Sequence, residues 1–89
     1  MVFEWDKAKN RANIAKHGVD FADSVAVFED DLALTRPDAD SRDERRALTL
    51  GMDGFGRLLV VVFVEPGPGR TRIISARPAS KQERKNYEN

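Results

Sequence analysis

The chain of 89 residues contains no cysteine and only one histidine. Without cysteine there is no disulfide framework and no thiolate nucleophile, and one histidine cannot build a zinc finger. The longest apolar run, Leu58–Val64, has seven residues, whereas a membrane-spanning helix needs about 18. The first residues, Met1–Asp6, show no basic segment followed by an apolar one, so no secretory signal is expected. These absences predict a cytoplasmic protein with no metal and no cofactor.

Composition and size predict one globular domain covering residues 1–89. Apolar residues make up 40% of the chain and charged residues 34%, which is typical of soluble domains. The net charge is zero, but residues 1–40 carry five Lys/Arg against nine Asp/Glu, whereas residues 41–89 carry ten against six. A basic face on the second half would attract nucleic acid or an acidic protein. The alternative is an ordinary solvated mixture of charges.

Two short helices are predicted near the start of the chain. Asp6 is placed to cap a helix over Lys7–His17, and Gly18 follows as the residue that ends it. Asp20 is placed to cap a second helix over Phe21–Phe28. Before the first cap lie Phe3 and Trp5, two large aromatic residues that we interpret as anchors of the core.

The rest of the chain is predicted to form a sheet followed by one more helix. Four strands are expected, over Leu32–Thr35, Glu44–Met52, Arg57–Glu65 and Thr71–Arg77. Their short connections make the sheet mostly antiparallel. Ser80 and Glu83 match a capping box that opens a final helix reaching about Glu88. The sequence thus predicts an α+β domain with its helices on one face of a four-stranded sheet.

Several segments together resemble the BrnT toxin family along essentially the whole chain. The segments are Phe3–Asp6, Lys16–Phe21, Glu44–Arg46, Gly56–Val61 and Arg72–Arg77. The resemblance implies a type II toxin with a RelE-like fold, a small ribonuclease that blocks translation by cutting RNA. It also implies a BrnA-like antitoxin as partner and a toxin homodimer within the complex. The alternative function is a toxin of the same fold that binds and inhibits a protein without cleaving RNA.

RNA cleavage without metal needs an acid, a base and cations that stabilise charge on the reacting phosphate, while the RNA supplies its own 2′-OH nucleophile. The candidate catalytic residues are His17, Arg57, Arg77 and Tyr87. His17 is predicted at the end of the first helix, where the helix dipole favours the imidazolium and hence a general acid. Its alternative role is to cap the last carbonyls of that helix.

Arg77 is the favoured cation for the transition state, because a planar guanidinium matches a phosphate with two parallel donors. Its alternative is a salt bridge to Glu83 or Glu44. Arg57 is expected to contact RNA or to pair across the hairpin. Tyr87 is expected to stack on a base, to donate a hydrogen bond, or only to pack the last helix onto the sheet.

The remaining basic residues supply candidates for RNA binding. They are Lys16, Arg45, Arg46, Arg72, Lys81 and Arg84. Alternation along a strand predicts that Arg46 shares the buried face of Leu48 and Leu50, with Arg45 on the other face. Arg72 and Arg77 are five residues apart, so the same rule predicts them on opposite faces. Glu83 is first a capping residue and only a second choice as general base.

Overall fold

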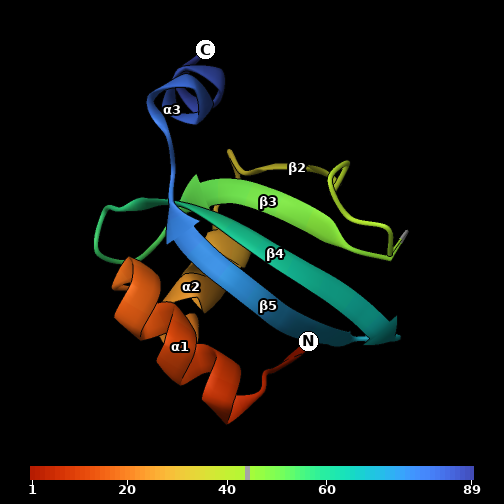
Figure 1. Cartoon of the computed structure of the whole chain (residues 1–89). Helices are drawn as coiled ribbons and strands as arrows, with labels where there is room; N and C mark the ends of the chain where they lie inside the picture. The colour runs from red at the N-terminus through yellow and green to blue at the C-terminus, as the bar shows by residue number, and fades with distance from the viewer. Residues whose placement is uncertain (44) are drawn as a thin grey trace.

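The computed structural model describes residues 1–43 and 45–89, and these form one sheet with helices on both of its faces (Figure 1). Glu44, which the sequence assigned to a strand and to a possible pair with Arg77, lies outside the described residues. The elements are β1 (Val2–Glu4), α1 (Lys7–His17), α2 (Phe21–Ser24), the 3₁₀ helix η1 (Val25–Glu29), β2 (Leu34–Pro37), β3 (Ala47–Met52), β4 (Leu58–Gly67), β5 (Arg70–Pro78) and α3 (Lys81–Glu88). None of the helices in the described residues has the length and apolar character that a membrane span requires.

The sheet has five strands in the order β1-β5-β4-β3-β2. The neighbours β5–β4, β4–β3 and β3–β2 are antiparallel, as predicted. The prediction of four strands is wrong, because β1 adds a parallel edge strand beside the start of β5. Three residues are too few to show alternation in a sequence, and this strand exists through tertiary contacts such as the 2.7 Å bond from the Val2 amide to the Gly69 carbonyl.

The central strand β4 is apolar on both faces and carries two hydrophobic clusters. Leu59 and Val61 face α2 and η1, where Val19, Phe21, Val27, Ile73 and Ala76 complete the larger cluster. Leu58 and Val60 face α3 and pack with Leu50, Ala79 and Tyr87. The expectation of helices on one face is therefore wrong, since Figure 1 shows α3 on the opposite side of the sheet from α1 and α2. A strand with two apolar faces requires cover on both.

Helix α1 and the aromatic anchors follow the prediction. Asp6 accepts a 2.9 Å hydrogen bond from the Lys9 amide, and Gly18 ends the helix at φ 70°, a left-handed conformation that glycine adopts without strain. Phe3 packs on Phe28 with ring centroids 5.1 Å apart, as expected of a core anchor.

Each predicted strand and the second helix differ from the structure by a few residues at one end or both, and two of these differences have clear local causes. The second helix becomes a 3₁₀ helix at Val25, and this tighter turn packs Val27 directly against β3. The contact is so close that a Cβ at Gly51 would lie 2.9 Å from the Val27 side chain. Strand β2 begins at Leu34 and not at Leu32, because Asp30 forms a turn by accepting from the Leu32 amide at 3.0 Å.

Asn13 joins α1 to the sheet. Strand β1 pairs with β5 only as far as Arg72, so the later residues of β5 have no strand on that side. The buried Asn13 amide takes its place: Nδ2 donates to the Ala76 carbonyl at 2.8 Å, and Oδ1 accepts from the Ala76 amide at 3.1 Å. Nδ2 also donates to the Val19 carbonyl at 2.9 Å, which fixes the segment after α1.

We expect Asn13→Ala to lower the free energy of unfolding by about 3 kcal/mol or more. The change leaves three buried backbone groups without partners, and each such group costs about 1–3 kcal/mol. Urea unfolding followed by circular dichroism measures the loss. Arg11→Ala, an exposed change in the same helix, should cost less than about 0.5 kcal/mol. Equal stability of Asn13→Ala and Arg11→Ala would contradict the role given to Asn13.

Candidate active site

A β-bulge in β5 brings two of the predicted arginines to the same face of the sheet. Arg77 lies opposite Val60 on β4, and Arg72 lies opposite Val64, four residues further along that strand. The register passes over Ile74, which has no partner. The expectation that Arg72 and Arg77 point to opposite faces is therefore wrong, because the extra residue of a bulge reverses the alternation beyond it. Both residues lie on the face that carries α3.

Arg77 is held in place by Glu83 at the start of α3. Its Nη1 donates to Oε1 at 2.8 Å and its Nη2 to Oε2 at 2.9 Å, while Nη1 also donates to the Pro78 carbonyl at 3.2 Å. This is the salt bridge that the sequence left open as an alternative. The Arg77 side chain nevertheless remains 41% exposed, against 22% for Glu83. Hydrogen bonds from Arg77 lower the pKa of Glu83 to about 2, so this carboxylate stays ionised.

The capping box predicted at the start of α3 is present. Ser80 accepts from the Glu83 amide at 3.2 Å, and the Ser80 amide donates to Glu83 Oε1 at 2.8 Å. The Glu83 carboxylate therefore accepts hydrogen bonds both from the Ser80 amide at the start of the helix and from Arg77. A group bound on both sides in this way is poorly suited to take a proton from a substrate.

Tyr87 fixes the far end of α3 to the sheet. Its hydroxyl donates to Asp30 Oδ2 at 2.7 Å, and the same oxygen accepts from the Met52 amide at 2.8 Å. The bond to Asp30 raises the pKa of Tyr87 above its ordinary value, so the hydroxyl stays protonated. The Met52 amide is the main cause of the lowered pKa of Asp30, followed by Tyr87. The structure thus shows the packing role, with the hydroxyl hydrogen bond of Tyr87 directed to Asp30.

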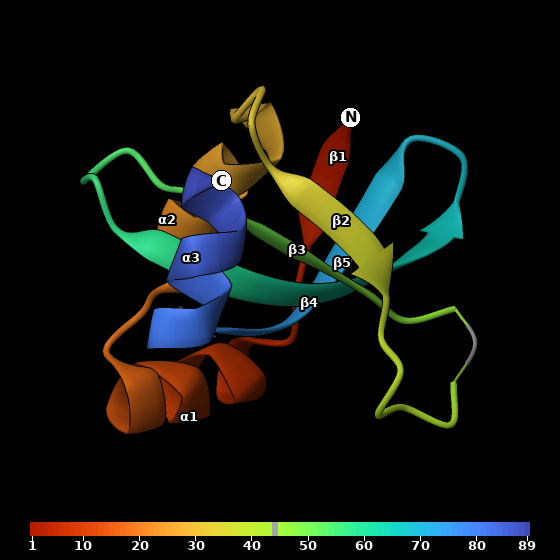
Figure 2. The same ribbon diagram turned by 90° about the horizontal axis from the view of Figure 1, so that it is seen from above.

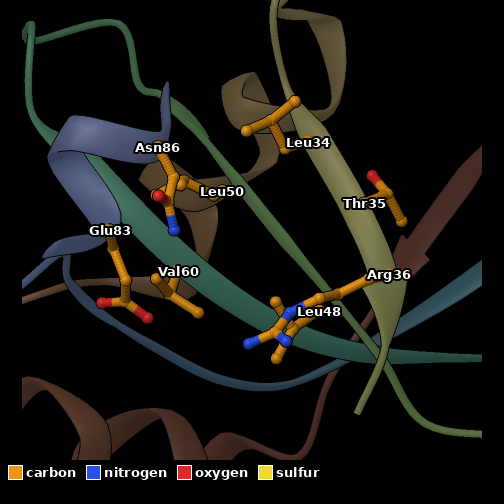
Figure 3. Close-up of a pocket in the computed structure, with 8 residues that line it drawn as sticks. All are labelled: Leu34, Thr35, Arg36, Leu48, Leu50, Val60, Glu83 and Asn86. Atoms are coloured by element: carbon orange, nitrogen blue, oxygen red, sulfur yellow. The ribbon is translucent and has the colours of Figure 1, made fainter. Parts of the chain in front are cut away.

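A cavity of about 100 Å³ opens between β2 and α3, next to the Arg77–Glu83 pair. Figure 3 shows its lining: Leu34, Thr35, Arg36, Leu48, Leu50, Val60, Glu83 and Asn86. Sequence reasoning missed Arg36 and Asn86. Arg36 lies two residues after Leu34, on the same face, but the predicted strand ended one residue too early. Asn86 lies three residues after Glu83, a spacing that places both on one side of a helix.

The other two predicted catalytic residues lie at the end of α1, which packs along the edge of β5. His17 is half-buried at the end of α1 and lines a separate hollow of about 220 Å³ with Lys9, Lys16 and Ser75 among its other residues. Arg57 lies beside the same helix end, because its Nη1 donates to the Gly18 carbonyl at 3.3 Å. The four predicted residues therefore form two pairs, one at α1 and one at α3.

Arg57 is engaged by carboxylates on its own face. Its Nε donates to the buried Asp53 at 2.8 Å, and Asp23 lies at 3.9 Å. The guanidinium also lies 5.6 Å from the centre of the exposed Phe55 ring. The predicted alternative, a pair within the β3–β4 hairpin, is what the structure shows.

The remaining predicted RNA-binding residues are spread over the surface. On the α3 face, Arg72 and Arg70 each contact Glu4 at 2.8 Å, and both lower its pKa. Lys81 is exposed in the first turn of α3. Arg84 lies 3.7 Å from Glu88, also on this helix.

Arg45 and Arg46 lie just before β3. Arg45 is exposed and pairs with Asp43 at 3.2 Å. Arg46 is half-buried and precedes Leu48 by two residues, on the side of the sheet that carries α3. Across residues 1–43 and 45–89, no group of three or more acidic or histidine side chains is arranged to hold a metal ion.

Viewed from above, α3 lies over one end of β4 with β2 beside it, and no helix in residues 1–43 and 45–89 covers the other end of this sheet face (Figure 2). This face carries four arginines: Arg36 on β2, Arg46 just before β3, and Arg72 and Arg77 on β5. Arg36 lines the cavity and Arg77 binds Glu83 beside it, so we take this face as the candidate active site.

Comparison with known proteins identifies the family of the chain. A family model for the ribonuclease toxin BrnT of type II toxin–antitoxin systems matches residues 5–83. The crystal structure of the Brucella abortus ribonuclease toxin BrnT is similar to this chain with a TM-score of 0.72 and 30% sequence identity, over 91% of this chain and 100% of that one. No relative was found among curated proteins. The chain, with its α+β fold of three helices and a five-stranded mixed sheet, therefore belongs to the BrnT family of ribonuclease toxins of type II toxin–antitoxin systems.

Proposed function

We propose that this toxin is a metal-independent endoribonuclease that cuts RNA at a phosphate bound by Arg77 and so inhibits translation and growth. Family membership implies an RNA substrate and a cognate antitoxin. The observation that carries the proposal is the fixed, half-exposed guanidinium of Arg77 on a sheet face rich in arginine. Glu83 orients this group without covering it.

The hydrogen bonds of Arg77 leave a suitable edge for a phosphate. Glu83 occupies one N–H of Nη1 and one of Nη2, and Pro78 takes the second N–H of Nη1. The Nε–H and the second N–H of Nη2 remain, and these two donors lie parallel on one edge of the guanidinium. Two parallel donors match two phosphate oxygens. Because Glu83 already fixes the group, little reorganisation is needed as charge grows on the phosphate.

The proposed reaction uses the nucleophile that RNA carries. The 2′-OH attacks the adjacent phosphorus, its proton passes to water, and the 5′-oxygen of the next nucleotide leaves with a proton from water. Within the described residues, the carboxylates beside Arg77 and Tyr87 are already hydrogen-bonded, and His17 lies in a separate hollow at the end of α1. We therefore assign the acceleration to charge stabilisation by Arg77, with Glu83 and Tyr87 as positioning residues. His17 and Arg57 take no part at this phosphate.

Arg77→Ala should lower the single-turnover rate of RNA cleavage by about 10²–10³, the usual cost of losing one preorganised electrostatic contact. Arg77→Lys should recover only part of the rate, because a point charge lacks two parallel donors. The double variant Arg77→Ala with Glu83→Gln avoids leaving an unpaired carboxylate and should be equally slow. Lys85→Ala on the same helix is the control. A folded Arg77→Ala variant that stays fully toxic would favour the alternative toxin that inhibits a protein.

Cleavage should persist in excess EDTA and leave 2′,3′-cyclic phosphate and 5′-OH ends, because the 2′-OH is the nucleophile and Arg77 the cation. Mass spectrometry of the products of a short synthetic RNA identifies the ends. Activity that EDTA abolishes and only Mg²⁺ or Mn²⁺ restores would contradict this mechanism.

Glu83→Gln should lower the free energy of unfolding by about 1 kcal/mol at neutral pH, since the pair is partly exposed to solvent. The folded carboxyl has a pKa of about 2 against an ordinary value of 4.5. Its stabilisation is therefore complete above the unfolded pKa and is lost as the pH falls toward the folded one. The difference between the two proteins in urea unfolding should shrink over that interval. Glu88→Gln, which removes an exposed pair, should show no such trend, and a constant difference for Glu83→Gln would refute the assignment.

A further inference from the structure

The cavity between β2 and α3 has the properties of a binding site for one base of the RNA. We infer that it holds a single unpaired nucleobase next to the cleaved phosphate, with guanine preferred. The inference deepens the proposed function and rests on it for the position of the phosphate. Its evidence is separate, and comes from the lining of the cavity, its size and its unused donors.

The floor of the cavity is apolar and suits the flat face of a base. Leu48, Leu50 and Val60 supply it from β3 and β4, and Leu34 supplies one wall from β2 (Figure 3). Leu34 is 46% exposed although it is a large aliphatic residue on a strand. A volume of about 100 Å³ is well below the roughly 300–1,000 Å³ of pockets that hold drug-sized ligands. It fits one ring system and leaves the ribose and phosphate outside.

Arg36 and Asn86 supply hydrogen-bond donors at the rim of the cavity. Figure 3 shows Arg36 reaching across from β2 above Leu48, and Asn86 directing its amide nitrogen into the cavity from α3. Among the described residues, neither the Arg36 guanidinium nor Asn86 Nδ2 donates to a protein group, whereas Asn86 Oδ1 already accepts from Gln82 at 3.3 Å. Glu83 is the one carboxylate in the lining, and Arg77 and Ser80 occupy it.

The Arg36 guanidinium and Asn86 Nδ2 are donors without a protein partner among the described residues. The cavity therefore favours bases that offer hydrogen-bond acceptors to them. Guanine presents two of them, O6 and N7, side by side on one edge, and arginine binding to this edge is the commonest specific contact with a base. The planar guanidinium of Arg36 can form both bonds, and Asn86 Nδ2 can donate a further one. Adenine presents an amino group where guanine presents O6, so it would leave an Arg36 donor without a partner. Such an unmatched polar group is the usual basis of discrimination.

The position of the cavity links base binding to cleavage. Glu83 lines the cavity and also binds both Nη atoms of Arg77, at 2.8 and 2.9 Å. One side chain therefore separates the proposed base site from the proposed phosphate site. A base and the phosphate attached to its own ribose are close enough to occupy the two sites together. Base binding in the cavity would then choose which phosphate reaches Arg77.

Cleavage of a pool of short RNAs with every base at each position, followed by sequencing of the product ends, tests this inference. The wild-type chain should cut preferentially beside guanine. Arg36→Ala and Asn86→Ala should each reduce the preference for guanine over adenine by about tenfold, while cuts at other bases keep their rate. Lys85→Ala removes a positive charge beside Asn86, at a residue that does not line the cavity, and should leave the preference unchanged. Folded Arg36→Ala and Asn86→Ala variants with the wild-type preference would overturn the inference.

A binding measurement separates a failure of this inference from a failure of the proposed function. Guanosine 5′-monophosphate should shift the methyl NMR signals of Leu34 and Leu48 more than the other three nucleotides do, and ribose 5-phosphate should not shift them. If these signals shift but no RNA is cut, the proposed function is wrong and the base site stands. If RNA is cut but no nucleotide shifts these signals, the base site is wrong and the proposed function stands.

Discussion

The arrangement of this toxin depends on the side-chain amide of Asn13. Beyond Arg72, strand β5 has no neighbouring strand on one side, and its backbone groups would be left buried without partners. An amide carries a donor and an acceptor at the spacing of a peptide group, so Asn13 can replace one residue of a missing strand. The third bond, to the Val19 carbonyl, fixes the chain where it leaves α1. One buried side chain thus sets the position of α1, the turn at Gly18 and the edge of β5.

Strand β4 is apolar on both faces, and the two faces of the sheet are covered to different extents. The face under α2 and η1 holds the larger cluster, with Phe21, Leu59 and Val61 essentially inaccessible to solvent. The opposite face is covered by α3 only at one end, and Tyr87 with Asp30 anchors that helix. The partly covered face leaves apolar floor beside charged residues, a combination suited to a ligand with flat bases and an anionic backbone.

Carboxylates on this face hold arginine side chains and the helix α3 in fixed positions. Glu83 orients Arg77, Glu4 holds Arg70 and Arg72 together, and Asp30 anchors α3 through Tyr87. Each of these carboxylates has a lowered pKa caused mainly by the groups that it binds. A ribonuclease that works by charge stabilisation benefits from this design, because arginines fixed in advance need little rearrangement when the phosphate gains charge.

The sequence alone determined the features that depend on neighbouring residues. Caps at Asp6 and Ser80, the left-handed turn at Gly18 and the apolar run of β4 are encoded within a few positions, so α1, α3 and the central strand followed the prediction. The combination of short motifs also identified the family. Tertiary structure alone decided β1, the face of α3 and the grouping of the candidate residues. The bulge at Ile74 brought Arg72 and Arg77 to one face, and the packing of α1 against β5 separated His17 from both, because strand register and layer position depend on contacts far apart in the chain.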